Sequence, residues 1–354
     1  MRILLVMDPL IPVPPRHYGG IERVIADLAA GLVARGHEVT LWAAPSSSTP
    51  ARLEPFGREG EWTRFSNVRN TLHLAARFWL RPGRFDVVHN FGRLAYLTPI
   101  ASWRIAKVQT YMRRIDPAKI RGAVRLAGRR GGPTLRFTAV SDVIRKTGEP
   151  GGGDWSVIYN CAPVARYTPR YDVDAATAPL VFLGRLERCK GAHSAIDVAE
   201  RLDRTLLIAG NLSDLPEEKV YFETEIAPRI DGQRVRFLGP VDDAAKNQLL
   251  GSAAALLLPI EWLEPFPVVL PEALACATPV VAFRQGGVPE GIDHGRTGFL
   301  CDTVDEMAAL VRRLPEIDRH TCRAEAERRF SDTAIVGEYE ALYRELLEKL
   351  PARS

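Results

Sequence analysis

Two glutamates, Glu264 and Glu272, stand eight residues apart in the run Glu-Pro-Phe-Pro-Val-Val-Leu-Pro-Glu-Ala-Leu. They lie between two apolar, strand-like runs, 254–259 and 279–283. A carboxylate after one strand and a second at the start of the next helix can converge at the carboxyl ends of parallel strands, where open α/β sheets bind ligands. Ionised carboxylate oxygens accept strong hydrogen bonds, so the pair suits a ligand with many hydroxyl groups. The spacing alone is common, and a helix-capping role for Glu272 is the alternative.

A second set of charges lies in the segment Gly-Arg-Leu-Glu-Arg-Cys-Lys-Gly at 184–191, between a buried apolar run and a predicted helix. From such a loop Arg185 and Lys190 can both reach a phosphate at the strand ends. The arginine supplies a planar fork of donors and the lysine a mobile point charge. Plain surface charge on a loop is the alternative interpretation.

A third candidate, Gly19-Gly20, separates the first predicted strand from the first predicted helix. Glycines let the backbone approach a ligand closely, and the helix that follows offers free N–H groups to an anion. The spacing differs from Gly-x-Gly-x-x-Gly, which disfavours a nicotinamide or flavin cofactor. An ordinary turn is the alternative.

These residues need a framework of parallel strands, and short apolar runs alternate with helical patterns in both halves of the chain. The predicted strands are 2–7, 38–44, 85–91, 107–111 and 137–141, then 180–184, 205–209, 235–238, 254–259 and 279–283. The predicted helices are 21–35, 192–202, 244–252, 272–276 and an amphipathic carboxyl-terminal helix from about 335. This alternation predicts two doubly wound, Rossmann-like α/β domains. We expect them at 1–163 and 164–334, with the helix at 335–354 docking on the first.

The composition is typical of a globular protein, with 46% hydrophobic and 25% charged residues. No apolar run approaches the ~20 residues of a membrane span, and the opening run is too short for a signal peptide. Five dispersed cysteines without a C-x-x-C pair favour a reducing compartment. We therefore expect a cytoplasmic protein.

The charge is unevenly distributed. Residues 1–150 carry 24 Lys and Arg against 11 Asp and Glu, a net +13, whereas 151–354 carry 23 against 32, a net −9. Ten of the basic residues fall within 99–136, beside a single acid, Asp116. Such a segment attracts phosphates, an anionic membrane surface or nucleic acid, although a solvated basic face would have the same composition. A nucleic-acid partner is disfavoured because few aromatic residues interleave with the charges.

Taken in this order, the three motifs resemble those of the family-four retaining glycosyltransferases, which have the GT-B fold. The resemblance extends to Gly-Gly-Val-Pro-Glu at 286–290, Thr-Gly-Phe-Leu at 297–300 and Val-Ile-Tyr-Asn at 157–160. It covers nearly the whole chain and is strongest from 180 to 302. The opening Pro-Pro-Arg-His-Tyr-Gly-Gly-Ile-Glu also resembles a branch that includes antibiotic-oligosaccharide transferases.

The resemblance implies transfer of a hexose-type sugar from a nucleoside diphosphate sugar to a glycan, lipid-linked or natural-product acceptor, with retention of configuration and without a metal or cofactor. The donor would lie between the domains, mostly on the second. Arg185 and Lys190 would hold the pyrophosphate and Glu272 the ribose hydroxyls. Glu264 would face the hexose near the backbone N–H groups of Phe266 and Val268.

The resemblance also implies that Gly19 and Gly20 bring first-domain amides to the phosphates. His89 matches a histidine common at the end of the third family strand and would contact donor sugar or acceptor; a core histidine is the alternative. Fixed positive charge at the leaving oxygens is a direct way to lower the barrier. The Asp-x-Asp string at 172–174 follows no strand, so we do not interpret it as a metal site.

The chain departs from the family pattern in places that bear on the sugar. Pro267 stands where the family usually has Gly and removes one N–H that would touch the hexose. Cys161-Ala162-Pro163 replaces the usual Gly-Val-Asp. Two other functions remain open from sequence: a nucleotide-sugar epimerase on the same fold, and a protein that binds sugar nucleotides without catalysis.

Overall fold

The computed structural model describes residues 1–15, 19–128 and 134–350. The chain divides into two compact units. The first comprises Met1–Tyr159 and the carboxyl-terminal segment from Asp332, and the second comprises Asn160–Ser331. The expected limits at 163 and 334 lie within four residues of these.

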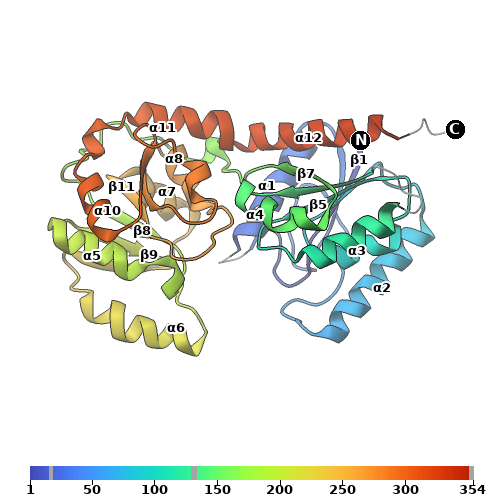
Figure 1. The fold of residues 1–354 in the computed structure, drawn as a ribbon, viewed down its shortest axis with the longest axis horizontal. Coiled ribbons are helices and arrows are strands. Elements are labelled where there is room, and N and C mark those ends of the chain that lie inside the picture. Colours follow the sequence, from blue (N-terminus) through green and yellow to red (C-terminus); the bar gives the residue numbers. More distant parts are fainter. Residues whose placement is uncertain (16–18, 129–133, 351–354) are drawn as a thin grey trace. The chain divides into compact units, whose positions relative to one another are not determined.

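The first unit holds a seven-stranded parallel sheet in the order β3-β2-β1-β4-β5-β6-β7 (Figure 1). Its strands are β1 (Arg2–Val6), β2 (Glu38–Trp42), β3 (Arg52–Leu53), β4 (Val87–Asn90), β5 (Ala106–Tyr111), β6 (Leu135–Ala139) and β7 (Asp154–Val157). Its helices include α1 (Gly20–Ala34), α2 (Arg64–Leu80), η1 (Leu94–Ile100), α3 (Pro117–Gly128), α4 (Asp142–Gly148) and α12 (Asp332–Glu348).

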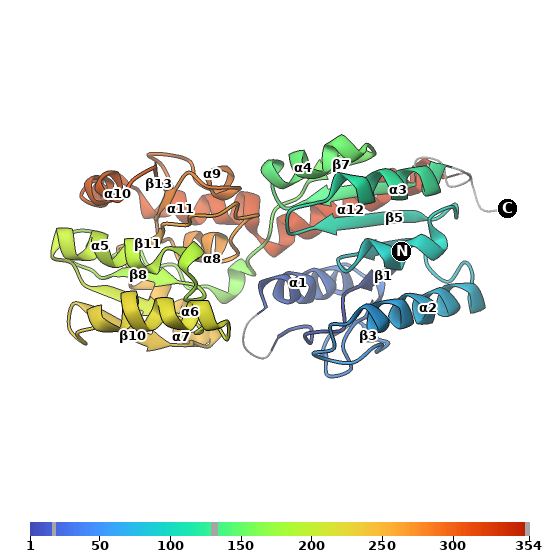
Figure 2. The ribbon, with the colours of Figure 1, turned by 60° about the horizontal axis from the view of Figure 1, so that its bottom comes forward.

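The second unit holds a six-stranded parallel sheet in the order β10-β9-β8-β11-β12-β13 (Figure 2). Its strands are β8 (Leu180–Leu183), β9 (Leu206–Ala209), β10 (Val235–Gly239), β11 (Ala255–Leu258), β12 (Val280–Phe283) and β13 (Gly298–Cys301). Its helices include η4 (Arg188–Lys190), α5 (Ala192–Leu202), α6 (Pro216–Tyr221), α7 (Asp243–Gly251), α8 (Val269–Ala275), α9 (Val288–Gly291), α10 (Val304–Val311) and α11 (Arg319–Glu325).

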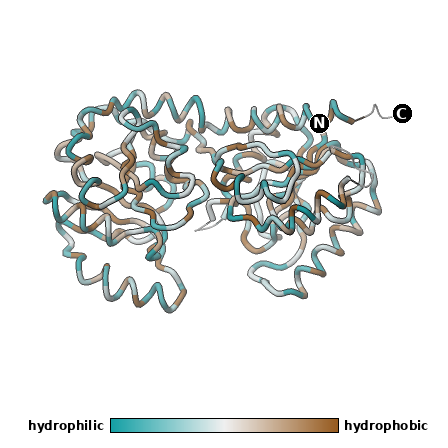
Figure 3. Tube along the Cα trace, viewed as in Figure 1, coloured by the Kyte–Doolittle hydropathy of each residue, from teal (hydrophilic) through white to brown (hydrophobic). Residues whose placement is uncertain are grey.

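The central strands of both sheets are buried on both faces, which explains why these strands are continuous apolar runs in the sequence. Hydrophobic residues accordingly concentrate on the central strands (Figure 3). In the first unit, α2 and η1 cover the sheet face that bears Val88, with Leu74 and Phe78 of α2 in the same cluster. The other face, which bears His89, is covered by α12.

The carboxyl-terminal helix α12 packs against α1 within the first unit (Figure 2). Glu340 accepts from Arg35 Nη1 at 2.8 Å and lies 3.1 Å from His37 Nε2. The apolar face of α12, with Tyr339 and Tyr343, is fully buried. The apolar face of α12 thus forms part of the core of the first unit.

Several element limits differ from the sequence expectation. The predicted start of α8 at Pro271–Glu272 is wrong, because the helix begins at Val269. Pro271 is tolerated in its first turn, where the backbone N–H has no helical partner. Among the described residues, the strands β3, β7 and β13 were not predicted, and neither were the helices α2, α3, α4, α6, α9, α10 and α11.

Candidate active site

In the second unit the chain order of the strands reverses between β8 and β11. Ligands of open α/β sheets bind at the carboxyl ends of the strands beside such a reversal. The loop after β8 carries Arg185 and Lys190, and the loop after β11 carries Glu264. The topology thus places both predicted sets of charges at this one position.

Two close backbone approaches hold these loops together. The N–H of Glu261 donates to the carbonyl oxygen of Cys189 at 2.9 Å. Gly191 has a φ of +78° and ends the loop against β11, where a Cβ would overlap the carbonyl oxygen of Pro259. A glycine is therefore required at 191 on both conformational and steric grounds.

Lys190 and Glu264 form the first ion pair of the site. The distance from Lys190 Nζ to Glu264 Oε2 is 2.5 Å, and Trp262 Nε1 donates to the same oxygen at 2.7 Å. The ammonium group also lies 5.1 Å from the centroid of the Trp262 ring, a cation–π distance. Trp262 was not predicted as a site residue. Its position two residues before Glu264 could have indicated that it lies beside this carboxylate.

The Gly-Gly-Val-Pro-Glu segment supports Glu264 from behind. Gly286 has a φ of +57°, and a Cβ at this position would overlap the backbone of Glu264. The next N–H, of Gly287, donates to the Glu264 carbonyl oxygen at 2.7 Å. The segment that carries the family resemblance thus fixes the backbone of a predicted site residue.

Glu272 forms the second carboxylate centre. Lys246 Nζ of α7 lies 2.6 Å from Glu272 Oε1, and the Tyr167 hydroxyl donates to that oxygen at 2.8 Å. Burial, followed by the adjacent Glu272 charge, raises the pKa of Tyr167 above its usual range, so its hydroxyl stays a donor. Neither Lys246 nor Tyr167 was predicted, because their contacts with Glu272 are set by tertiary packing and no local pattern marks them.

The two glutamates share a feature that bears on ligand binding. Each is largely buried, and each receives both of its protein donors on a single carboxylate oxygen. Within residues 1–15, 19–128 and 134–350, no hydrogen-bond partner is found for Oε1 of Glu264 or for Oε2 of Glu272. Both carboxylates therefore retain an acceptor atom for a ligand hydroxyl.

Arg185 is held by an acid of its own loop. Its guanidinium group pairs with Glu187, which also accepts from Ser213 at 3.4 Å. About a third of the Arg185 side chain is exposed. The charge of Arg185 is thus fixed in orientation yet accessible from the solvent.

Phe266 and Val268 belong to the short loop that leads into α8. The Phe266 ring is buried against Phe330, with centroids 5.6 Å apart, and its carbonyl oxygen accepts from Asn160 Nδ2 at 2.8 Å. Val268 is the residue before the first turn of α8. The loop is therefore anchored, and the proposed contact of its N–H groups with a sugar stays a prediction.

In the first unit, Gly19 caps α1 without a side chain, and Gly20 is the first helical residue. Glu22 folds back over this end, because a Cβ at Gly19 would lie 2.7 Å from Glu22 Oε2. Burial raises the pKa of Glu22, which favours its neutral form at the helix terminus. The role of Gly19 and Gly20 in phosphate binding stays a prediction.

His89 is fully buried in β4. Its Nδ1 lies 2.6 Å from the Tyr343 hydroxyl and its Nε2 lies 2.6 Å from Thr110 Oγ1. Burial lowers the pKa of His89 well below its usual value, so the ring is neutral. Because both nitrogens are used and no surface is reached, this geometry favours the core histidine over contact with donor or acceptor.

Asp8 is a residue that the sequence analysis did not single out. It follows β1, at the strand reversal of the first sheet. Its Oδ1 accepts from the Tyr96 hydroxyl at 2.8 Å and from Arg93 Nε at 3.2 Å. Its position directly after the first strand could have marked Asp8 in the sequence as a residue at a strand end.

The basic segment 99–136 is less uniform than its composition suggests. Lys107 is fully buried and donates to Trp103 O, Ile105 O and Thr134 Oγ1 at 2.6–2.9 Å, and burial lowers its pKa to about 7. Arg136 pairs with Glu345 at 2.6 Å. Arg129 and Arg130 lie outside the described residues. The exposed basic residues that remain are Arg104, Arg113, Arg114, Lys119, Arg121 and Arg125.

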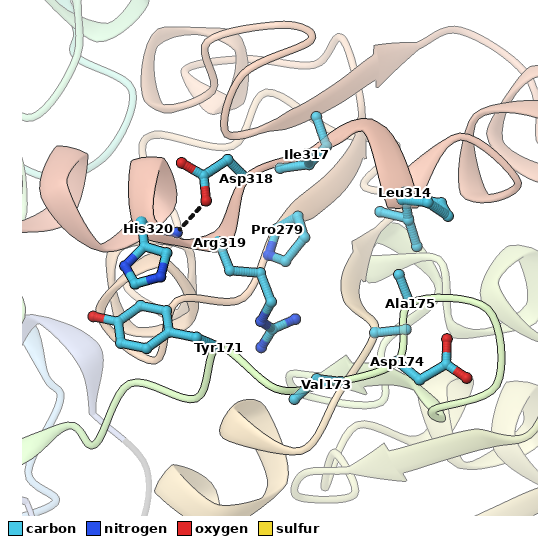
Figure 4. A pocket seen from close by; sticks show the side chains of 12 residues that line it. Tyr171, Val173, Asp174, Ala175, Pro279, Leu314, Ile317, Asp318, Arg319 and His320 are labelled. Carbon is cyan, nitrogen blue, oxygen red and sulfur yellow. Dashed lines mark hydrogen bonds between the residues drawn. The ribbon is translucent and has the colours of Figure 1, made fainter.

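A pocket with a cavity volume of about 350 Å³ lies at the opposite edge of the second sheet, where β11 and β12 begin (Figure 4). Arg319 extends into it, and its guanidinium donates to the carbonyl oxygens of Arg170 and Ala253 at 2.7 and 3.0 Å. Asp174 of the Asp-x-Asp string lines this pocket. The string is thus at the edge away from Lys190 and Glu264. Over the described ranges, no cluster of three metal-binding side chains occurs, and no helix is long and apolar enough to cross a bilayer.

Comparison with known proteins adds to this geometry. Residues 173–334 match the family described as glycosyl transferases group 1, and residues 18–166 match glycosyltransferase family 4. A glycogen synthase of Mycobacterium tuberculosis is 28% identical over 94% of this chain and 91% of its own length.

Two solved structures show the same architecture. A glycosyltransferase involved in avilamycin A biosynthesis is 28% identical and has a TM-score of 0.69, over 99% of this chain and 98% of that one. The Anabaena protein HepE, in complex with UDP-glucose, is 20% identical with a TM-score of 0.74, over 98% of this chain and 100% of that one.

Proposed function

Since this chain belongs to the group 1 glycosyltransferases and has the GT-B fold, we propose that it transfers a hexose-type sugar from a nucleoside diphosphate sugar to an acceptor hydroxyl, with retention of configuration. The observation that carries the proposal is the pair of half-occupied carboxylates, Glu264 and Glu272, at the strand reversal beside Lys190. A sugar nucleotide offers hydroxyls on both the hexose and the ribose, and two phosphates between them. The site offers carboxylate oxygens that can accept hydrogen bonds from these hydroxyls, and cationic side chains that can bind the phosphates.

Each residue has a distinct part in this proposal. Arg185 and Lys190 bind the pyrophosphate and stabilise the negative charge that develops as it leaves. Glu272, through its uncommitted Oε2, accepts from the ribose hydroxyls. Glu264, through its uncommitted Oε1, accepts from the hexose, with the N–H groups of Phe266 and Val268 beside it.

The reaction needs no protein nucleophile in this scheme. The bond from the anomeric carbon to the leaving phosphate oxygen breaks, and the acceptor oxygen attacks from the same face. The acceptor proton passes to the departing phosphate. His89 has no part in these steps, because its ring is buried and both nitrogens are hydrogen-bonded.

The acceptor is proposed by class. The relatives include enzymes named for a glycan and for a natural product. A glycan, lipid-linked or natural-product hydroxyl is therefore the acceptor that we propose, with no metal ion or cofactor taking part.

The test begins with the donor. A thermal-shift screen of nucleoside diphosphates and their sugars identifies the base and hexose, since a ligand at 100 times its Kd adds about 2.7 kcal/mol of stability. Turnover with the best donor is then measured for Arg185→Ala and Lys190→Ala. We expect kcat to fall by about 10²–10³ in each.

Arg188→Ala is the matched control. Arg188 lies in the same loop but pairs with Glu225 and is half exposed, so its kcat should stay within about twofold of the wild-type value. Full turnover in both Arg185→Ala and Lys190→Ala would refute the proposed roles. An isomerised sugar nucleotide formed without any acceptor would instead identify an epimerase.

A further inference from the structure

Helix α2 carries an apolar stripe that faces away from the protein. Phe65, Leu72 and Trp79 are 75%, 64% and 67% exposed, and Val68 is also exposed. Their spacing of three, four and seven residues places all four on one side of the helix. Trp62, just before the helix, is exposed as well.

The fold does not use this stripe. The opposite side of α2 packs in the core through Asn70, Leu74 and Phe78, which are buried. A capping box between Thr63 and Ser66 fixes the amino-terminal end. The helix is therefore positioned without its outer face. An exposed apolar surface rich in large side chains is typical of an interaction site.

Charge identifies the partner. Residues 62–84 contain five arginines and no acidic residue. Arg69 pairs with Glu61 and Arg84 with Glu54, so these two charges are balanced within the fold. Arg64 and Arg81, at the two ends of the helix, are exposed. The exposed surface of α2 therefore combines tryptophan, phenylalanine and leucine along the helix with a positive charge at each end, a composition that suits the headgroup region of an anionic bilayer. Tryptophan in particular favours the boundary between lipid and water.

We propose that α2 docks the protein on an anionic phospholipid surface, with Phe65, Val68, Leu72 and Trp79 inserted among the headgroups. The helix has 17 residues and lies along the surface rather than across the bilayer. This assigns the membrane contact to a different segment from the basic stretch 99–136. In α3 of that stretch Ile120 and Ala123 are buried and Val124 and Leu126 are half-buried, so this helix presents no large, fully exposed apolar side chain.

The test is flotation with phosphatidylcholine vesicles, with and without about 30% phosphatidylglycerol. The full-length wild-type protein should float with the anionic vesicles. The triple variant Phe65→Ser/Leu72→Ser/Trp79→Ser should partition at least about tenfold less. The charge variant Arg64→Gln/Arg81→Gln should lose about fivefold per arginine on anionic vesicles only.

Two controls isolate the helix. Leu212→Ser/Leu215→Ser/Val220→Ser removes exposed apolar residues of the second unit and should float like the wild-type protein. Arg114→Gln/Arg121→Gln/Arg125→Gln tests the stretch 99–136. A larger loss in this variant than in the α2 variants would overturn the assignment to α2.

A second copy of the chain is the rival occupant of the stripe. Light scattering during size exclusion distinguishes it: a wild-type dimer that the α2 triple variant converts to monomer, without vesicle binding by either protein, would refute the proposal. Donor binding by thermal shift should be unchanged in the α2 variants, so the outcome is independent of the proposed transfer reaction.

Discussion

The end of β4 in the first unit and the end of β11 in the second unit occupy equivalent positions beside the strand reversal of their sheets, yet the polar side chains near them are used differently. At β4, Asn90 Nδ2 donates to Gln109 Oε1 at 2.6 Å, and both ring nitrogens of His89 are within 2.6 Å of hydroxyl groups. In the second unit, Glu264 and Glu272 each keep one oxygen without a partner among the described residues.

The difference shows that a position at the end of a strand does not by itself make a binding site. Buried polar groups must be hydrogen-bonded, and a network that satisfies all its members stabilises the fold. A binding site needs polar atoms whose capacity exceeds what the protein itself uses. By this criterion the loops after β8 and β11 can bind a ligand, and His89 belongs to the interior.

Among the variants that test this contrast between the two units, the largest expected effect comes from Gly286→Ala. The new methyl group would overlap the backbone of Glu264, so the loop that carries this carboxylate must move. A displacement of about 1 Å in a positioning group can cost 10²-fold in rate. We expect kcat/KM for transfer to fall by about that factor or more, measured by product formation from the identified donor.

Gly295→Ala is the matched control, because Gly295 also has a positive φ, +82°, but a Cβ there meets nothing within 4 Å. Both variants bear the backbone cost of about 1–2 kcal/mol. Equal kcat/KM in the two variants would show that Gly286 does not position the site. It would also weaken the conclusion that the second unit, in contrast to the end of β4, carries the binding site.

The next effect separates the two carboxylates. Glu272→Gln should weaken the binding of the nucleoside diphosphate itself by about tenfold, because hydrogen bonds to a charged group contribute about 1.5–3 kcal/mol. Glu264→Gln should leave that affinity within about twofold and lower kcat by about 10–100-fold, since Glu264 is proposed to face the hexose. Calorimetry with the nucleotide and turnover with the sugar nucleotide give the two numbers.

An exchange of these phenotypes would reverse the assignment of ribose and hexose. Equal losses of nucleotide affinity in both variants would mean that the carboxylates act as one unit. Lys246→Met serves as a companion variant, because it removes a partner of Glu272 Oε1 and leaves the oxygen proposed for the ribose in place.

His89→Phe tests whether the polar side chains at the end of β4 stabilise the fold and take no part in transfer. The variant leaves the Tyr343 hydroxyl without its His89 partner and removes one partner of Thr110 Oγ1, which still lies 2.5 Å from Thr138 Oγ1 and 3.4 Å from the Tyr339 hydroxyl. Loss of buried hydrogen bonds of this kind costs about 1–3 kcal/mol each, so we expect the free energy of unfolding to fall by about 2–3 kcal/mol. The kcat of the folded protein should change less than about twofold. A large loss of kcat with normal stability would return His89 to the active site.

The same variant has a pH signature. The folded protein holds His89 neutral because burial lowers its pKa, whereas the unfolded chain binds a proton near pH 6.5. The unfolded state therefore gains protons as the pH falls below about 6.5, and stability decreases by at most about 1.4 kcal/mol per pH unit. Urea unfolding at pH 7.5 and 5.5 should show this component in the wild-type protein and not in His89→Phe.

Much of the architecture could be predicted from sequence because buried parallel strands are apolar runs. The strands that were missed lack that signal. β13 begins at Gly298, whose glycine is required because a Cβ would overlap the Val280 backbone. β7 is an edge strand without a fully buried residue. Helix α2 is apolar on two opposite faces, so it shows no single amphipathic stripe.

The site was predicted less completely than the fold. Arg185, Lys190, Glu264 and Glu272 could be proposed from sequence because each stands in a local motif, and their roles in binding stay a prediction. Lys246 lies 26 residues from Glu272 in the sequence, and Tyr167 lies 105 residues away. Only the packing of α7 and of the segment after β7 against α8 brings them together. Likewise, sequence periodicity places His89 in a strand but does not show that α12 covers it.

The smallest expected effect comes from Asp174→Asn. This variant tests the edge of the second sheet where the strands begin, opposite the proposed site. The Asp174 carboxylate accepts from the Ala176 N–H at 2.9 Å and the Thr177 hydroxyl at 2.6 Å, at the edge of the second sheet away from Lys190. If transfer depends only on the edge where the strands end, kcat should stay within about twofold, with and without a chelator. The contrary result would be turnover that requires a divalent ion in the wild-type protein and is lost in Asp174→Asn. It would place the chemistry at the opposite edge and contradict an active site at the carboxyl ends of β8 and β11.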